Sequence, residues 1–201
     1  MLQISYIISS ILTSPLLILF LFSTEKKIII LDVKRWSKIV GFINTSDLIN
    51  LLLLLSTKKE FRNLYYYRIK KGNLLNEIFM SFFKIFYKEC PTLIITADYI
   101  GPGLFIQHGF CTIIAAKSIG ENCWINQQVT IGYRDKINCP TIGNNVRITS
   151  GAKVIGEVKI SDNVTVGANA VVVKNVPENC VVVGVPARIV RRDGIKVNEQ
   201  L

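Results

Sequence analysis

Residues 142–172 read IGNNVRITSGAKVIGEVKISDNVTVGANAVV, and an aliphatic residue stands at every sixth position of this stretch. These positions are Ile142, Ile148, Val154, Ile160, Val166 and Val172. A period of six fits neither an amphipathic helix nor a simple alternating strand. Gly and Asn stand between the aliphatic positions, and both residues accept positive φ at low cost. The pattern predicts a parallel β-helix built from hexapeptide repeats.

The same period continues upstream to the middle of the chain, through Ile131, Ile125, Ile119, Ile113, Ile106 and Ile100. Nine of the eleven gaps are six residues long, whereas Ile106 to Ile113 is seven and Ile131 to Ile142 is eleven. Three hexapeptides close one triangular coil, so about four stacked coils are expected. The longest gap predicts a loop outside the coils, either a solvated loop or a flap over a substrate.

The charge of the chain is uneven. Its net charge is +10, and the first 90 residues hold 13 Lys and Arg against 6 Asp and Glu, a balance of +7. No nucleic-acid-binding motif accompanies this excess, so nucleic acid is not an expected partner. A surface that faces anionic lipid or an acidic polysaccharide fits the charge better. The five cysteines form no CxxC pair and there is one histidine, so we expect reduced thiols and no metal site.

The N-terminal half is expected to be helical, hydrophobic and basic. Residues 4–22 carry no charge and are just long enough to span a bilayer, although Pro15 interrupts them. Two interpretations stay open: membrane contact, either spanning or interfacial, and burial in a soluble helical bundle. Residues 58–68 mix basic and aromatic side chains as interfacial helices do, but aromatic packing within a bundle explains them equally well.

Four motifs in the second half of the chain carry a family resemblance. They are IGPGLFIQHG at 100–109, QVTIG at 128–132, SGAKVIG at 150–156 and VGVPARI at 183–189. Together they resemble the serine acetyltransferase family of hexapeptide acyltransferases, and most of all its branch that acetylates capsule or lipopolysaccharide sugars. The resemblance implies an α+β chain with a helical region at 1–92, a left-handed parallel β-helix acyltransferase domain at 93–190 and a C-terminal tail at 191–201. It also implies homotrimers with sites between subunits, and acetyl-CoA as co-substrate without a permanently bound cofactor.

His108 is the only histidine, lies where the gap lengthens to seven, and matches the family's catalytic histidine. The resemblance makes it the general base that takes the acceptor's hydroxyl proton as the oxygen attacks the acetyl thioester. The resemblance also implies a CoA-binding set, which comprises Gly132, Gly151, Ala152, Lys153, Ala168 and Arg188. The small residues would let the pantetheine arm approach closely, or simply fill the corners of the coils. The two basic residues are candidates for the CoA phosphates, or plain surface charges.

Three positions depart from the serine enzymes. Leu93 stands fifteen residues before His108, where the family has an aspartate that orients the ring. Ala116 replaces a glutamate, Cys139 replaces a second histidine, and the nearby Asp98 is out of register with the missing aspartate. A pocket for a charged amino acid needs such polar partners. We therefore expect the acceptor to be a hydroxyl of a surface-polysaccharide sugar.

Two alternatives remain beside this expectation. One is serine O-acetyltransferase of cysteine biosynthesis, and the other is a solenoid without catalytic activity that serves as a scaffold. Transfer of acetyl from acetyl-CoA to any acceptor separates the enzymes from the scaffold. The expected location is the cytoplasm, with peripheral contact at the inner membrane face as a further option.

Overall fold

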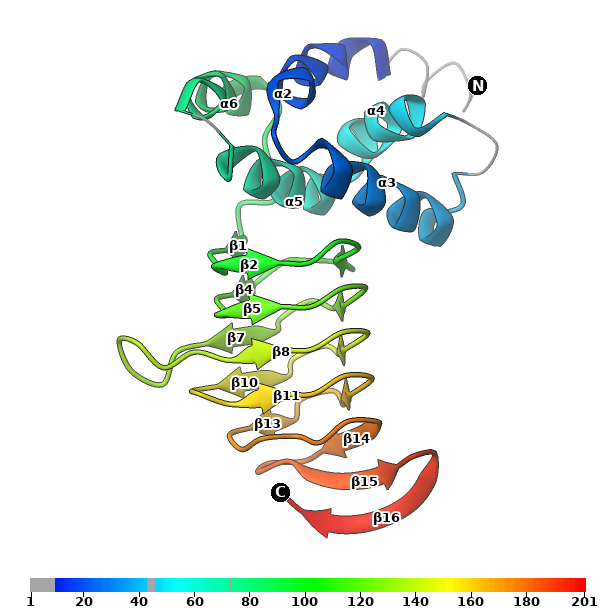
Figure 1. Ribbon diagram of the computed structural model, residues 1–201, viewed down its shortest axis with the longest axis vertical. Coiled ribbons are helices and arrows are strands. Elements are labelled where there is room, and N and C mark those ends of the chain that lie inside the picture. Colours follow the sequence, from blue (N-terminus) through cyan, green and yellow to red (C-terminus); the bar gives the residue numbers. More distant parts are fainter. Residues whose placement is uncertain (1–9, 43–45, 73) are drawn as a thin grey trace. The chain divides into compact units, whose positions relative to one another are not determined.

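The computed structural model describes residues 10–42, 46–72 and 74–201, and the chain falls into two compact units, Met1–Pro91 and Thr92–Leu201. The first unit is helical and the second is a parallel β-helix, which confirms the expected fold class (Figure 1). The sequence placed the boundary between them after residue 92.

The helical unit is a small bundle with a mixed aromatic and ionic core. It contains η1 (Ser14–Leu16), α2 (Leu17–Phe22), α3 (Lys26–Val40), α4 (Asp47–Thr57), α5 (Lys59–Lys70) and α6 (Leu74–Phe86). Trp36 of α3 meets Phe61 of α5 edge to face, with ring centroids 5.2 Å apart. Nearby, Arg68 Nε donates to Asp32 Oδ2 at 3.0 Å, and both side chains are at most 3% exposed.

Local signals explain where these helices begin and end. α3 ends at Gly41, whose φ of 83° is a backbone conformation that glycine adopts readily. α4 begins after Ser46, whose hydroxyl accepts a hydrogen bond from the N–H of Ile49. Among the described residues, no helix combines the length and apolar character that a membrane crossing requires. Residues 4–9 of the uncharged stretch lie outside the described residues.

The second unit winds three parallel sheets around one apolar core (Figure 1). Sheet A contains β1 (Leu93–Ile95), β4 (Thr112–Ile114), β7 (Thr130–Gly132), β10 (Lys153–Ile155) and β13 (Val171–Val172). Sheet B contains β2 (Tyr99–Ile100), β5 (Ser118–Ile119), β8 (Thr141–Ile142) and β11 (Lys159–Ile160). Sheet C contains β3 (Phe105–Ile106), β6 (Trp124–Ile125), β9 (Arg147–Ile148), β12 (Thr165–Val166), β14 (Cys180–Val183), β15 (Arg188–Arg192) and β16 (Ile195–Gln200). The chain passes through sheet A five times, one more than the four coils that the six-residue period predicted.

The six-residue period places the core side chains, with one correction. Most aliphatic residues of the period are at most 2% exposed, but Ile113 is 40% exposed, while Thr112 and Ile114 are fully buried. The reason is a wide turn. The buried Thr112 comes six residues after the buried Ile106, whereas one coil later Val129 comes only four residues after Ile125. The extra residues therefore lie in the turn that carries His108, and the inward register shifts by one after it.

The end of the chain continues sheet C. Residues 191–201, which the sequence suggested as a tail, include the end of β15 and all of β16. Both strands pair antiparallel, β15 with β14 and β16 with β15. This hairpin closes the last coil of the β-helix.

Candidate functional site

Two lines of turns define the sides of sheet A. The C–A edge comprises the turns that lead from sheet C to sheet A, at 107–111, 126–129, 149–152 and 167–170. The A–B edge comprises the turns from sheet A to sheet B, at 96–98, 115–117, 133–140, 156–158 and 173–175. His108 lies on the C–A edge, and the long loop 133–140 lies on the A–B edge.

The turn at 107–111 holds His108 at the surface of the C–A edge. His108 and Cys111 have φ values of 53° and 52°, a region that residues other than glycine rarely adopt. The N–H of Phe110 donates to the His108 carbonyl at 2.8 Å, which tightens the turn. The His108 side chain is exposed and makes no hydrogen bond within the described part of the chain. An accessible imidazole of this kind can take a proton from a bound hydroxyl.

From the second coil after His108 onward, the C–A edge becomes a track of small side chains. Gln127, Ser150 and Ala168 follow His108 at the same place in successive turns. The N–H of Gly151 donates to the Gln127 carbonyl at 3.0 Å, so the turns are tied to one another. Gly151 has a φ of +73°, and a Cβ there would lie 2.0 Å from Asn169 Oδ1, so any other residue would be strained and would displace the Asn169 side chain. A long, narrow ligand can lie close to the backbone along such a track.

Four of the six expected CoA-binding residues lie at or next to the edge that carries His108. Gly151 and Ala168 are in its turns, and Lys153 adjoins it because its Nζ donates to the Gln128 carbonyl at 2.6 Å. Ala152 is fully buried, so its side chain points into the core.

The structure places the other two expected residues elsewhere. Gly132 ends β7 at the A–B edge, where its carbonyl accepts a hydrogen bond from the N–H of Gly156 at 3.0 Å. Arg188 begins β15, which is five strand spacings from β3 in sheet C, or about 24 Å along the axis. Only a ligand that runs most of the length of the β-helix could touch both His108 and Arg188.

A cluster next to His108 escaped the sequence analysis. Gln107 Oε1 accepts hydrogen bonds from Trp124 Nε1 at 3.2 Å and from Asn126 Nδ2 at 3.4 Å. The Trp124 ring packs edge-on against Phe105, with centroids 4.6 Å apart, and the Arg147 guanidinium lies 5.1 Å from the Trp124 centroid. These contacts fix the Gln107 carboxamide through its oxygen and leave its amino group as a donor. The sequence shows only that Phe105 and Trp124 each precede the inward residue of their hexapeptides, which does not predict their contact.

The loop at 133–140 is ordered by its own polar groups. The Asp135 carboxylate accepts hydrogen bonds from the N–H of Asn138, the N–H of Ile137 and the amide of Asn138, at 2.9, 3.0 and 2.7 Å. These hydrogen bonds hold the pKa of Asp135 below its usual value. A hydrogen bond with the Cys139 thiol raises the pKa of the Tyr133 hydroxyl. The loop is therefore more structured than a plain solvated connection.

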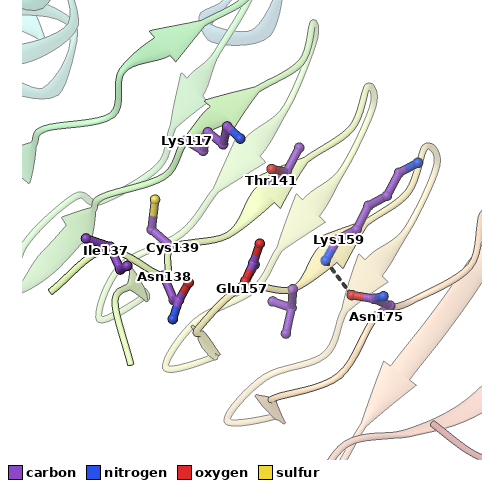
Figure 2. Close-up of a pocket in the computed structure, with 9 residues that line it drawn as sticks. Lys117, Ile137, Asn138, Cys139, Thr141, Glu157, Lys159 and Asn175 are labelled. Atoms are coloured by element: carbon purple, nitrogen blue, oxygen red, sulfur yellow. Dashed lines mark hydrogen bonds between the residues drawn. The ribbon is translucent and has the colours of Figure 1, made fainter. Parts of the chain in front are cut away.

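A pocket of about 550 Å³ opens beneath this loop (Figure 2). Its lining comprises Lys117, Ile137, Asn138, Cys139, Thr141, Glu157, Val158, Lys159 and Asn175. The backbone N–H of Lys159 donates to Asn175 Oδ1 at 2.8 Å and fixes its lower rim. The pocket holds charges of both signs, yet it lies across sheet A from His108. One chain alone therefore does not place this loop over His108.

Among the described residues, no carboxylate forms a hydrogen bond or ion pair with His108, so none takes the place of the aspartate that the resemblance implies. Leu93, at that position, is 4% exposed in β1 and pairs with Thr112 in register. Asp98 lies on the A–B edge, where its charge acts on Tyr133. In the described part of the chain, no group of three or more His, Cys, Asp and Glu side chains could hold a metal ion.

The chain is similar to serine acetyltransferases in sequence. It is 43% identical over 103 residues to the serine acetyltransferase of Synechococcus elongatus and 46% identical over 104 residues to that of Staphylococcus aureus. These matches cover 49% and 50% of this chain but 42% and 49% of the two relatives, so the chain spans about half of their length. No family model matches the chain.

The fold is similar to solved serine acetyltransferases as well. The crystal structure of the Neisseria gonorrhoeae enzyme has a TM-score of 0.65 and 26% identity, and covers 86% of this chain and 68% of that one. A structure of the same enzyme in complex with serine has a TM-score of 0.65 and 26% identity, and covers 83% and 69%. The helical unit followed by a β-helix is thus an arrangement that these enzymes share.

These comparisons correct the expected acceptor. The relatives and structural neighbours named here are serine acetyltransferases, which contradicts the expectation of a polysaccharide sugar and favours its alternative. The expectation gave decisive weight to Leu93, Ala116 and Cys139. It gave no weight to the overall sequence identity, which reaches 46% over 104 residues. The proposed capsule or lipopolysaccharide branch finds no support in these comparisons.

Proposed function

We propose that this chain is an acetyl-CoA-dependent serine O-acetyltransferase. The observation that carries the proposal is 43–46% identity to serine acetyltransferases over about half the chain, combined with an exposed imidazole on the edge of the same fold. The structural likeness to an enzyme crystallised with serine supports the same acceptor.

His108 would act as the general base. Its imidazole takes the proton of the serine hydroxyl as that oxygen attacks the thioester carbonyl of acetyl-CoA. The tetrahedral intermediate then collapses, the C–S bond breaks, and the imidazolium returns the proton to the CoA thiolate. The products are O-acetylserine and CoA, and the imidazole is neutral again. The Gln107 amino group, held beside His108 through its oxygen, is available to bind an oxygen of the acceptor.

The donor would lie along the C–A edge. The small residues Gly151 and Ala168 leave the backbone accessible there, and Lys153 supplies a positive charge at its border. A homotrimer would complete the site, with the loop at 133–140 of one subunit against the C–A edge of the next. One observation supports this arrangement: His108 and the loop lie at opposite edges of one chain.

The test is CoA release from acetyl-CoA with L-serine, followed by chromatography because the cysteines disturb thiol reagents. We expect serine-dependent release in the native chain and a loss of about 10²–10⁴-fold in His108→Ala, with acetyl-CoA still bound. L-alanine, which lacks the hydroxyl, serves as the matched control acceptor. Binding of acetyl-CoA without any serine-dependent release would refute serine as the acceptor, and equal rates in His108→Ala would refute the role of His108.

A further inference from the structure

Helix α6 turns its more apolar side outward. Six large apolar side chains of this helix are between 47% and 67% exposed: Leu75, Ile78, Phe79, Phe82, Ile85 and Phe86. Its inner side carries Asn76, Met80 and Phe83, which are at most 9% exposed. A helix that only packs on its own bundle places its apolar stripe inward. The outward stripe is therefore surface that the helical unit itself leaves uncovered.

The exposed apolar surface continues onto the neighbouring segment. Ile11, Leu12, Ile18, Leu21 and Phe22 are between 42% and 65% exposed. Helices α2 and α6 contact each other, and the Tyr87 hydroxyl donates to the Leu12 carbonyl at 2.7 Å (Figure 1). We call the exposed side chains of residues 11–22 and of α6 together the apolar face.

Four exposed lysines lie on segments that adjoin this face in the chain. Lys26 and Lys27 begin α3 four and five residues after Phe22, and Lys70 and Lys71 end α5 just before α6. The two pairs are close in space because a Cβ at Gly72 would lie 3.6 Å from Thr24 Oγ1. The acidic residues Glu25 and Glu77 lie on the same segments, so the local balance stays positive.

We propose that the apolar face binds the surface of an anionic phospholipid bilayer. Its apolar side chains would enter the boundary between headgroups and acyl chains, while the lysines contact the lipid phosphates. The charge favours an anionic occupant, because the exposed Lys26, Lys27, Lys70 and Lys71 on the bordering segments outnumber the acidic Glu25 and Glu77 there. The helices would lie in the interface and not cross it, in line with the length and hydropathy of the described helices. The proposal does not depend on the proposed acetyl transfer.

The contribution of the lysines to vesicle binding is tested by flotation of the full chain with phosphatidylcholine vesicles, with and without phosphatidylglycerol. We expect binding to the anionic vesicles, weakened by added salt. Replacing both Lys26→Gln and Lys27→Gln should weaken that binding about 20- to 30-fold, since each lysine near an anionic surface contributes about fivefold. The matched control is Lys38→Gln with Lys59→Gln, which removes the same charge from the same unit. Lys38 lies about 18 Å along α3 from Lys26, so this control should bind nearly as well as the native chain.

The apolar contribution needs its own pair of variants. Leu75→Gln with Ile85→Gln removes two side chains that are 66% and 63% exposed, and should reduce vesicle binding about tenfold or more. Ile137→Gln with Ile195→Gln removes two apolar side chains of the β-helix that are 80% and 70% exposed, and should leave binding unchanged. Thermal unfolding of each variant reports whether the fold is intact.

Two results would overturn the proposal. One is failure of the native chain to bind anionic vesicles at low salt, or equal binding to both kinds of vesicle. The other is vesicle binding that stays the same in both Lys26→Gln/Lys27→Gln and Leu75→Gln/Ile85→Gln, while sedimentation shows that Leu75→Gln/Ile85→Gln self-associates more weakly than the native chain. That second result would assign the apolar face to contact between copies of the chain. Serine-dependent CoA release, measured without vesicles, stays a separate test of the proposed function.

Discussion

In the β-helix, a residue's place in the six-residue period determines whether its side chain is buried, whereas apolar residues of the helical unit lie on both sides of a helix. Ile119 and Ile125 are at most 1% exposed, and the residues that precede them face outward. In α6, by contrast, Phe83 is 9% exposed while Phe82 and Phe86 are 56% and 67% exposed. A period identifies the core only where the opposite face is polar. The helical unit lacks that contrast, so its sequence predicts helices without showing which side is covered.

The helical unit holds a buried ion pair, Asp32–Arg68, and an exposed one, Lys34–Asp47, and the largest expected effect tests that difference. Asp32→Ala would leave Arg68 buried without its carboxylate partner, and we expect a loss of about 3–5 kcal/mol in the free energy of unfolding. Lys34→Ala breaks the pair with Asp47, whose side chains are 59% and 41% exposed, and should cost about 1 kcal/mol or less. Urea unfolding of both variants provides the measurement. Equal losses would show that burial of the Asp32–Arg68 pair is not what stabilises the bundle.

The second prediction tests which residue of β4 faces the core of the β-helix. Ile114 is fully buried, so Ile114→Ala should cost about 2–5 kcal/mol in unfolding free energy. Ile113, its neighbour, is 40% exposed, so Ile113→Ala should change stability by about 0.5–1 kcal/mol. The same denaturant titration compares the two. A larger loss in Ile113→Ala would show that Ile113 faces the core, as the six-residue period of the sequence suggests.

This register explains how much of the site could be predicted. The sequence located the β-helix and the position of His108 at a lengthened gap, but it did not predict that Gly151 and Ala168 share an edge with His108. It missed the shift from Ile113 to Ile114, because the turn at 107–111 holds two residues of positive φ and a strand of aliphatic residues fits either register.

The Gln107 cluster was missed for a different reason. It depends on which outward side chains stack in successive coils of sheet C, and a one-dimensional period carries no information on such contacts between coils. The acceptor was predicted wrongly because three substitutions say which polar groups are absent. They do not say which groups replace them, and Gln107, which precedes His108 in the chain, has a carboxamide fixed through its oxygen.

The smallest effect tests whether the C–A edge is built for close approach of a ligand. Gly151→Ala adds a Cβ 2.0 Å from Asn169 Oδ1 at a φ of +73°, and should cost about 1–3 kcal/mol in unfolding free energy. Gly132→Ala is the matched control, since its Cβ would meet only Thr130 Cγ2 at 3.7 Å. Both glycines were expected to contact CoA, but only Gly151 shares the edge with His108. If that edge carries the donor, Gly151→Ala raises the acetyl-CoA concentration needed for half-maximal rate while Gly132→Ala does not. A rise in both variants would instead extend the donor site across sheet A to the A–B edge, where the pocket beneath the loop at 133–140 lies.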